Sequence, residues 1–185
     1  ERGVSRIMII DWDVHHGNGT QDAFYDSDQV LFVSPHQSPL YPGSGAANER
    51  GEGQGIGYTI NVPLRAGGGD EVYKTVFEEI VVPAANAYQP ELVLVSAGFD
   101  AHAADPLANM RVTETGFAEM ARHVREIAET HAGGRLVAFL EGGYDPPALA
   151  RSVAATLAVL DNANSAAAST LFGADAPHSQ GDAQE

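Results

Sequence analysis

The sequence has 185 residues, of which 44% are hydrophobic and 19% are charged, as expected of a globular domain. Ten Lys and Arg against 25 Asp and Glu give a net charge of −15, so direct binding to nucleic acid is not expected. Cysteine is absent, so any metal must be held by His, Asp or Glu side chains. No apolar run approaches the roughly 20 residues of a membrane span, and we expect a cytoplasmic protein.

Short, continuous apolar runs predict five strands. Four of them lie at residues 6–10, 29–33, 92–95 and 135–140, and each ends in glycine or in polar residues. A weaker fifth candidate lies at 58–62. Runs of this length without alternation are typical of parallel strands that are covered on both faces.

Helical patterns separate the later strands. The first begins at Asp70 and presents one apolar face until Pro83, which should end or kink it. The second covers about 113–132, and the third begins at Asp145, an N-cap followed by proline, and runs to 160. Strands that alternate with helices predict an α/β fold with a parallel sheet flanked by helices.

Composition divides the chain into a folded part, 1–162, and a tail, 163–185. The tail is rich in Ala, Ser, Asp and Gly, and we expect it to be flexible. The chain opens on Glu1 without an initiator Met or the layout of a signal peptide. We therefore interpret it as a piece of a longer chain.

The segment 11–16, Asp-Trp-Asp-Val-His-His, directly follows the first predicted strand. Alternate side chains of an extended segment share a face, so Asp11, Asp13 and His15 can converge. A lone histidine beside an aspartate is usually structural. Three such groups at the carboxyl end of a buried strand, where α/β sheets bind ligands, predict half of a divalent-metal site.

Two later strands end in residues that could complete this site. Asp100 follows the strand at 92–95, and a buried carboxylate needs a cation or hydrogen-bond donors as company. The ordinary alternative for such an aspartate is a capping or loop-forming role, which suits Asp105 better than Asp100. Residues 141–144, Glu-Gly-Gly-Tyr, follow the last strand. Glycines allow close approach to a ligand and a phenol can donate to an oxyanion, although such a turn by itself is more often structural.

Three other chemistries lack their sequence signatures. Lys74, the single lysine, has no phosphate-binding Gly-x-x-x-x-Gly before it. The glycines at 51–57 have the wrong spacing for a dinucleotide fingerprint, and Ser44 lies in Gly-Ser-Gly rather than in a nucleophile elbow. Metal-dependent chemistry remains.

Six motifs in order resemble the histone deacetylase superfamily, in particular its class II-like bacterial branch, alongside acetylpolyamine amidohydrolases and acetoin-utilisation proteins. They are DWDVHHGNGTQ (11–21), LYPGSG (40–45), NVPL (61–64), SAGFD (96–100), DPL (105–107) and EGGY (141–144). The resemblance covers about 6–160. It implies the arginase/deacetylase α/β fold, of which this chain would be the C-terminal part, with the N-terminal part missing.

The resemblance also implies roles for single residues. Asp13, His15 and Asp100 match the zinc ligands, with iron as the alternative metal, and Tyr144 matches the tyrosine that stabilises the oxyanion. The other implied roles are Asp11 and Asn18 as partners of two tandem histidines, Asp11 and Ser34 as ligands of a structural potassium ion, and Tyr41, Leu107, Gly142 and Gly143 as substrate-binding residues.

The implied function is zinc-dependent hydrolysis of an acetylated lysine, or of a small acetylated amine, to acetate and a free amine. The family's tandem histidines would lie upstream of Glu1, so an inactive metal-binding fragment is one alternative. An acetylpolyamine amidohydrolase is another, although Leu107 occupies the rim position where polyamine-selecting relatives carry a carboxylate. A ureohydrolase of the same fold would need a second aspartate in the run 100–104, which ends in alanine.

Overall fold

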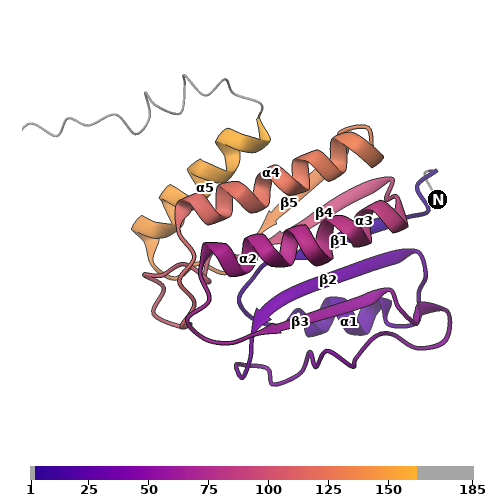
Figure 1. The fold of residues 1–185 in the computed structure, drawn as a ribbon, viewed down its shortest axis with the longest axis horizontal. Coiled ribbons are helices and arrows are strands. Elements are labelled where there is room, and N and C mark those ends of the chain that lie inside the picture. The colour runs from indigo at the N-terminus through magenta and orange to yellow at the C-terminus, as the bar shows by residue number, and fades with distance from the viewer. Residues whose placement is uncertain (1–2, 162–185) are drawn as a thin grey trace, which may run out of the picture.

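The computed structural model describes residues 3–161, which form a five-stranded parallel sheet in the order β3-β2-β1-β4-β5 (Figure 1). The strands are β1 (Ile7–Asp11), β2 (Val30–Gln37), β3 (Thr59–Leu64), β4 (Leu92–Ala97) and β5 (Leu136–Leu140). All five predicted strands and the parallel sheet are confirmed. The predicted tail, 163–185, lies outside the described residues.

Four helices cover one face of the sheet, and α1 lies against β2 on the other side (Figure 1). The helices are α1 (Asn18–Phe24), α2 (Asp70–Val76), α3 (Val82–Tyr88), α4 (Glu114–His131) and α5 (Pro146–Leu160). The sequence did not predict α1, whose seven residues contribute a single buried side chain, that of Gln21. None of the described helices is long and apolar enough to cross a membrane.

Pro83 does not end its helix, contrary to one outcome that the sequence allowed. A π-helical turn, Phe77–Val81, joins α2 to α3, and Pro83 lies in the first turn of α3. Proline lacks an N–H and collides with the carbonyl four residues earlier, so the wider π turn relieves the conflict directly before it. The helix continues to Tyr88 and ends at Gln89, whose φ of 55° is left-handed.

The main core lies between the sheet and the long helices. Met8 and Ile10 of β1 and Val93 and Val95 of β4 belong to one buried cluster with aromatic side chains from the helices, among them Phe77 and Phe117. On the opposite face Ile9, Val30 and Phe32 form a small second cluster. The sheet is therefore most thoroughly covered at β1 and β2, next to the motifs.

Strand β5 departs from the expectation that it is covered on both faces. Val137, Phe139 and Leu140 expose 45%, 54% and 62% of their surface. Within residues 3–161 β5 is an edge strand, paired on one side with β4. Its apolar composition matches that of the central strands, so the run alone could not reveal its position at the edge.

Candidate metal centre

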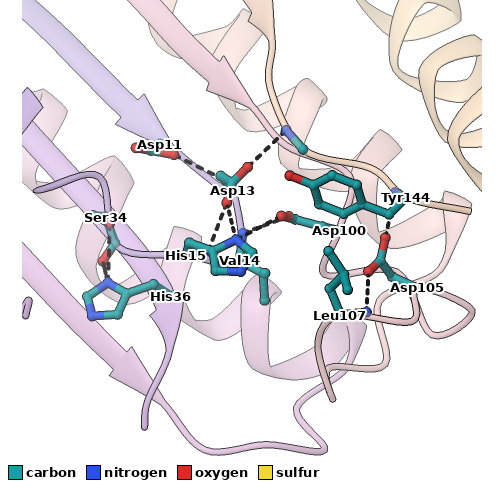
Figure 2. A network of polar contacts seen from close by, with 11 residues as sticks. Asp11, Asp13, Val14, His15, Ser34, His36, Asp100, Asp105, Leu107 and Tyr144 are labelled. Atoms are coloured by element: carbon teal, nitrogen blue, oxygen red, sulfur yellow. Dashed lines mark hydrogen bonds and ion pairs between the residues drawn. The ribbon is translucent and has the colours of Figure 1, made fainter. Parts of the chain in front are cut away.

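The carboxyl ends of β1 and β4 bring Asp13, His15 and Asp100 together (Figure 2). His15 Nδ1 lies 3.0 Å from Asp13 Oδ1 and 3.1 Å from Asp100 Oδ2, and one ligand atom of each residue lies within 4.8 Å of the others. Ligand atoms about 2.0–2.2 Å from a tetrahedral zinc ion are separated by roughly 3.3 Å. These three residues, called the ligand group below, therefore fit a divalent metal.

Backbone hydrogen bonds hold the ligand group in place. Asp13 Oδ1 accepts a hydrogen bond from the His15 N–H at 2.8 Å, and Asp100 Oδ1 accepts one from the Val14 N–H at 2.8 Å. Trp12 and Val14 are fully buried in the core, which turns Asp13 and His15 to the opposite side. The alternation that the sequence suggested is thus confirmed for these two residues.

Asp11 is outside the ligand group, although the sequence suggested that it could converge with Asp13 and His15. Its Oδ1 accepts a hydrogen bond from the Asp13 N–H at 3.1 Å, and the residue is buried. It lines a hollow of about 220 Å³ beside the ligand group, together with Asp13, His15, His16, Gly17, Gly19, Thr20, Ser96 and Glu141. Asn18, predicted to act with Asp11, begins α1 and is exposed.

The electrostatics of the ligand group favour a cation. Burial and the neighbouring Asp13 charge raise the pKa of Asp100 to about 7, and burial also raises the pKa of Asp11 well above its ordinary value. Carboxylates that are buried close together repel one another, and a divalent cation between them removes that cost. Two carboxylates and one imidazole therefore form a donor set that is short of positive charge.

Glycines allow the turn after β5 to approach the ligand group. A Cβ at Gly142 would collide with the carboxylates of Asp13 and Asp100, and the Gly142 N–H donates to Asp13 Oδ2 at 3.0 Å. Gly143 has a φ of 141°, which side-chain-bearing residues rarely adopt, and a Cβ there would press against Leu149. Both glycines thus let the 141–144 turn carry Tyr144 to the edge of the ligand group.

The Tyr144 phenol points across Asp100 toward Asp13 (Figure 2). Burial, followed by the charges of Asp100 and Asp13, raises the pKa of Tyr144, so the hydroxyl stays protonated and able to donate. Leu107 lies nearby and Tyr41 has its ring centre 6.4 Å from that of His15. Tyr144, Leu107 and Tyr41 are 51%, 54% and 79% exposed, so they form an open surface around the ligand group.

His16 lies in a second polar cluster that sequence reasoning did not identify. Its Nε2 lies 3.0 Å from Gln21 Oε1 and its Nδ1 lies 2.8 Å from Ser44 Oγ. Gln21 donates in turn to Glu49 at 2.7 Å and receives a hydrogen bond from Asn61 at 2.7 Å. Gln21 is close to His16 in the chain, but Ser44, Glu49 and Asn61 are distant from it, which is why no local motif revealed the cluster.

His36 and Ser34 adjoin this cluster. The His36 ring centre lies 4.9 Å from that of His16, and its Nε2 lies 3.1 Å from the Gly45 carbonyl. Ser34 is fully buried on β2, where its hydroxyl lies 3.2 Å from His36 Nδ1. The group formed by His16, Gln21, His36, Ser44, Glu49 and Asn61 is called the His16 network below.

Asp105 is the other residue whose role sequence reasoning left incomplete. The expected loop-forming role is present, because its Oδ1 accepts a hydrogen bond from the Leu107 N–H at 2.9 Å. Its Oδ2 also accepts a hydrogen bond from the Tyr144 N–H at 2.7 Å, although Tyr144 is distant in the chain (Figure 2). Asp105 is buried and thus joins two segments of the open surface.

The chain matches the family model "Histone deacetylase domain" over residues 1–160. A "Probable deacetylase" from Archaeoglobus fulgidus is 52% identical over 144 residues, covering 78% of this chain and 40% of that protein. A "Histone deacetylase-like amidohydrolase" from Pseudomonas aeruginosa is 49% identical over 143 residues, covering 77% of this chain and 38% of that protein.

A solved structure, "Crystal Structure of HDA15 HD domain", superposes with a TM-score of 0.81 at 42% identity, covering 85% of this chain and 44% of that one. The chain thus spans well under half the length of these relatives. Its sheet has the architecture expected from the arginase/deacetylase resemblance. By sequence, by fold and by the ligand group at its sheet edge, the chain belongs to the histone deacetylase family.

Proposed function

We propose that this chain carries the metal-binding half of a zinc-dependent deacetylase that hydrolyses an acetylated amine to acetate and a free amine. The observation that carries the proposal is the convergence of Asp13, His15 and Asp100, with the Tyr144 phenol pointing toward them. Family membership and relatives described as deacetylase and amidohydrolase support it.

The ligand group would hold the metal through one imidazole nitrogen and two carboxylate oxygens. When bound, zinc polarises a carbonyl and lowers the pKa of water toward about 7. A donor set without thiolate suits zinc and also iron, which stays the alternative metal. The backbone bonds to Asp13 and Asp100 hold the carboxylates in place before any metal arrives.

Tyr144 would donate a hydrogen bond from its hydroxyl to the oxygen that gains negative charge as the acetamide carbonyl becomes tetrahedral. Burial, followed by the charges of Asp100 and Asp13, raises the pKa of the Tyr144 hydroxyl, so the hydroxyl keeps its proton. Leu107 and Tyr41 would line the path of the substrate's aliphatic stem, which favours an acetylated lysine over an acetylated polyamine. Gly142 and Gly143 would place the tyrosine.

The general base is proposed to come from a segment outside Glu1–Glu185. Within the described part of the chain, His15 faces the two carboxylates and both ring nitrogens of His16 have partners. The hollow lined by Asp11 leaves room for an additional side chain, with Asp11, and by family resemblance Asn18, as its partners. The isolated chain would then be the inactive metal-binding fragment named above as an alternative.

Two further assignments stay predictions. A structural potassium ion held by Asp11 and Ser34 fits their oxygen donors and their position on neighbouring strands. The cytoplasmic location also stays a prediction.

The test compares metal content and acetate release from an acetyl-lysine peptide, with the protein expressed from its complete reading frame. We expect about one zinc or iron per chain and acetate release, both lost in Asp100→Ala. Asp70→Asn changes a carboxylate that accepts hydrogen bonds from Thr113, so this variant should keep the metal and the acetate release. A metal-loaded protein that releases no acetate would refute the proposed function.

A further inference from the structure

A single carboxylate joins the two segments that carry Leu107 and Tyr144. Asp105 Oδ1 accepts from the Leu107 N–H at 2.9 Å, and Oδ2 accepts from the Tyr144 N–H at 2.7 Å (Figure 2). Asp105 exposes 7% of its surface, so water competes little for either bond. Hydrogen bonds to an ionised acceptor are roughly twice as strong as neutral ones.

The bond to Leu107 is local and has an ordinary explanation. An aspartate that accepts from the backbone two residues later forms an Asx turn, which shapes a loop and needs no further role. The bond to Tyr144 is different, because it spans 39 residues and links the loop after β4 to the turn after β5. Loop formation by itself does not require it.

On its C-terminal side Tyr144 adjoins Asp145, which caps α5 by accepting from the Ala148 N–H at 2.8 Å. The Tyr144 side chain is 51% exposed, so packing holds the ring only in part. The preceding turn is anchored at Gly142, which donates to Asp13 and accepts from the Phe99 N–H at 2.8 Å. Gly143, the most permissive residue type, separates that anchor from Tyr144. The Asp105 carboxylate therefore accepts the Tyr144 N–H at the point between the permissive Gly143 and the capped start of α5.

We infer that Asp105 is a positioning residue that sets the Tyr144 phenol relative to the ligand group and ties the Leu107 rim to it. The inference rests on the proposed function for the role of Tyr144, but its geometric part stands without it. Both oxygens of the carboxylate are needed, since each of the two N–H groups requires an acceptor. Asparagine offers a single acceptor oxygen, and its amide nitrogen cannot accept.

The first experiment is a double-mutant cycle on the protein expressed from its complete reading frame. Asparagine forms Asx turns well, so Asp105→Asn should keep the Leu107 bond and lose the Tyr144 bond. We expect kcat to fall about tenfold or more, because small misplacements of a catalytic group are costly. KM should change less than about threefold, since substrate binding is not the interaction removed.

The cycle distinguishes positioning from a purely structural role. In a Tyr144→Phe background, Asp105→Asn should lower kcat by less than about twofold, because the hydroxyl it positions is absent. An equal loss in both backgrounds would overturn the inference. Asp70→Asn is the matched control, since Asp70 also accepts two hydrogen bonds, from the Thr113 N–H and hydroxyl, away from the ligand group. It should leave kcat unchanged.

The second experiment needs no activity. Amide hydrogen exchange is measured on the zinc-loaded protein, where Asp105→Asn should raise the exchange rate of the Tyr144 amide about tenfold or more. The Phe99 amide, bonded to Gly142, should not change. An unchanged rate at Tyr144 would overturn the inference. Faster exchange at every amide would mean global unfolding, and Asp105→Ser, which keeps one acceptor, would then replace Asp105→Asn.

The two experiments separate the inference from the proposed function. If the wild type releases no acetate, the proposed function fails, while the exchange rate at Tyr144 still decides whether Asp105 fixes that residue. If the wild type is active and the cycle is additive, the proposed function stands and the inference fails.

Discussion

His15 and His16 are adjacent in the chain, but their imidazole rings have different partners and belong to two separate regions. In the ligand group, the His15 imidazole faces the carboxylates of Asp13 and Asp100 at 3.0 Å and 3.1 Å. In the His16 network, both ring nitrogens meet neutral partners, Gln21 and Ser44. The ligand group gathers two carboxylates around one imidazole, whereas the His16 network surrounds its one carboxylate, Glu49, with hydrogen-bond donors.

The partners of the two imidazoles therefore distinguish a metal centre from a polar core even when no ion is bound. In the His16 network the single carboxylate, Glu49, accepts hydrogen bonds from the Gln21 side chain and from the Gly45 and Ala46 N–H groups, so its charge is already compensated by donors. Asp100 and the adjacent Asp11 are incomplete, because burial raises the pKa of each carboxyl and no counter-charge offsets the lost hydration. Sequence position does not distinguish the two histidines, whereas their partners do.

The largest expected effect comes from replacing each of the two histidines with alanine and comparing the metal content of the variants. His15→Ala removes a metal ligand, so metal content should fall from about one to below about 0.1 per chain. His16→Ala should keep the metal, and should lower the free energy of unfolding by about 1–3 kcal/mol because buried partners lose a hydrogen bond. Elemental analysis and urea unfolding measure both. Loss of metal in both variants would break the comparison.

Tyr144→Phe tests the chemistry at the ligand group without touching the metal. Removing one oxyanion donor should lower kcat by about 10²–10³. Metal content should stay at the wild-type value, because Tyr144 is outside the set of metal ligands. The measurement is steady-state deacetylation of an acetyl-lysine peptide, with elemental analysis of the same samples. A wild-type rate in Tyr144→Phe would remove the phenol from the mechanism.

The two regions should respond to pH in opposite directions when the protein is metal-free. Burial raises the folded-state pKa of Asp100 to about 7, above an unfolded value of about 3.9. Its contribution to stability is therefore present below about pH 4 and is lost as pH rises through about 7. Burial lowers the pKa of His36 from 6.5, so the network loses stability as pH falls through and below that value.

Urea unfolding of metal-free protein between pH 4 and pH 8 would separate these contributions. Asp100→Asn should remove much of the loss on the alkaline side, and His36→Gln should remove loss on the acidic side. Zinc should reverse the alkaline trend, because the metal binds the deprotonated carboxylate. If Asp100→Asn leaves the alkaline slope of stability unchanged, the ligand group is not the origin of that slope.

Leu107→Glu gives the smallest expected effect and tests the open surface around the ligand group. A carboxylate there could pair with the distal ammonium of an acetylated polyamine, which leucine cannot do. The ratio of kcat/KM for acetylspermidine over acetyl-lysine peptide should rise about tenfold, a typical result of one specific contact. Leu157→Glu is the matched control, since Leu157 is 56% exposed, against 54% for Leu107, and lies on α5. A wild type that already prefers acetylspermidine would contradict the assignment.

The strands and most of the ligand group could be predicted from the order of residues along the chain. Apolar runs mark β1 and β4, and polar residues directly after them must lie at the same edge of a parallel sheet. Alternation then places Asp13 and His15 on one side once Trp12 and Val14 enter the core. These inferences need only local periodicity and the rule that parallel strands end together.

Features that depend on partners from distant segments could not be predicted and emerge from the fold. Asp105 reaches Tyr144 across 39 residues, and His16 reaches Ser44 across 28 residues. A carboxylate that forms a local turn and one that also holds a distant tyrosine have the same sequence pattern. The place of β5 at the edge of the described sheet likewise follows from strand order, because an apolar run carries no information about which strand lies beside it.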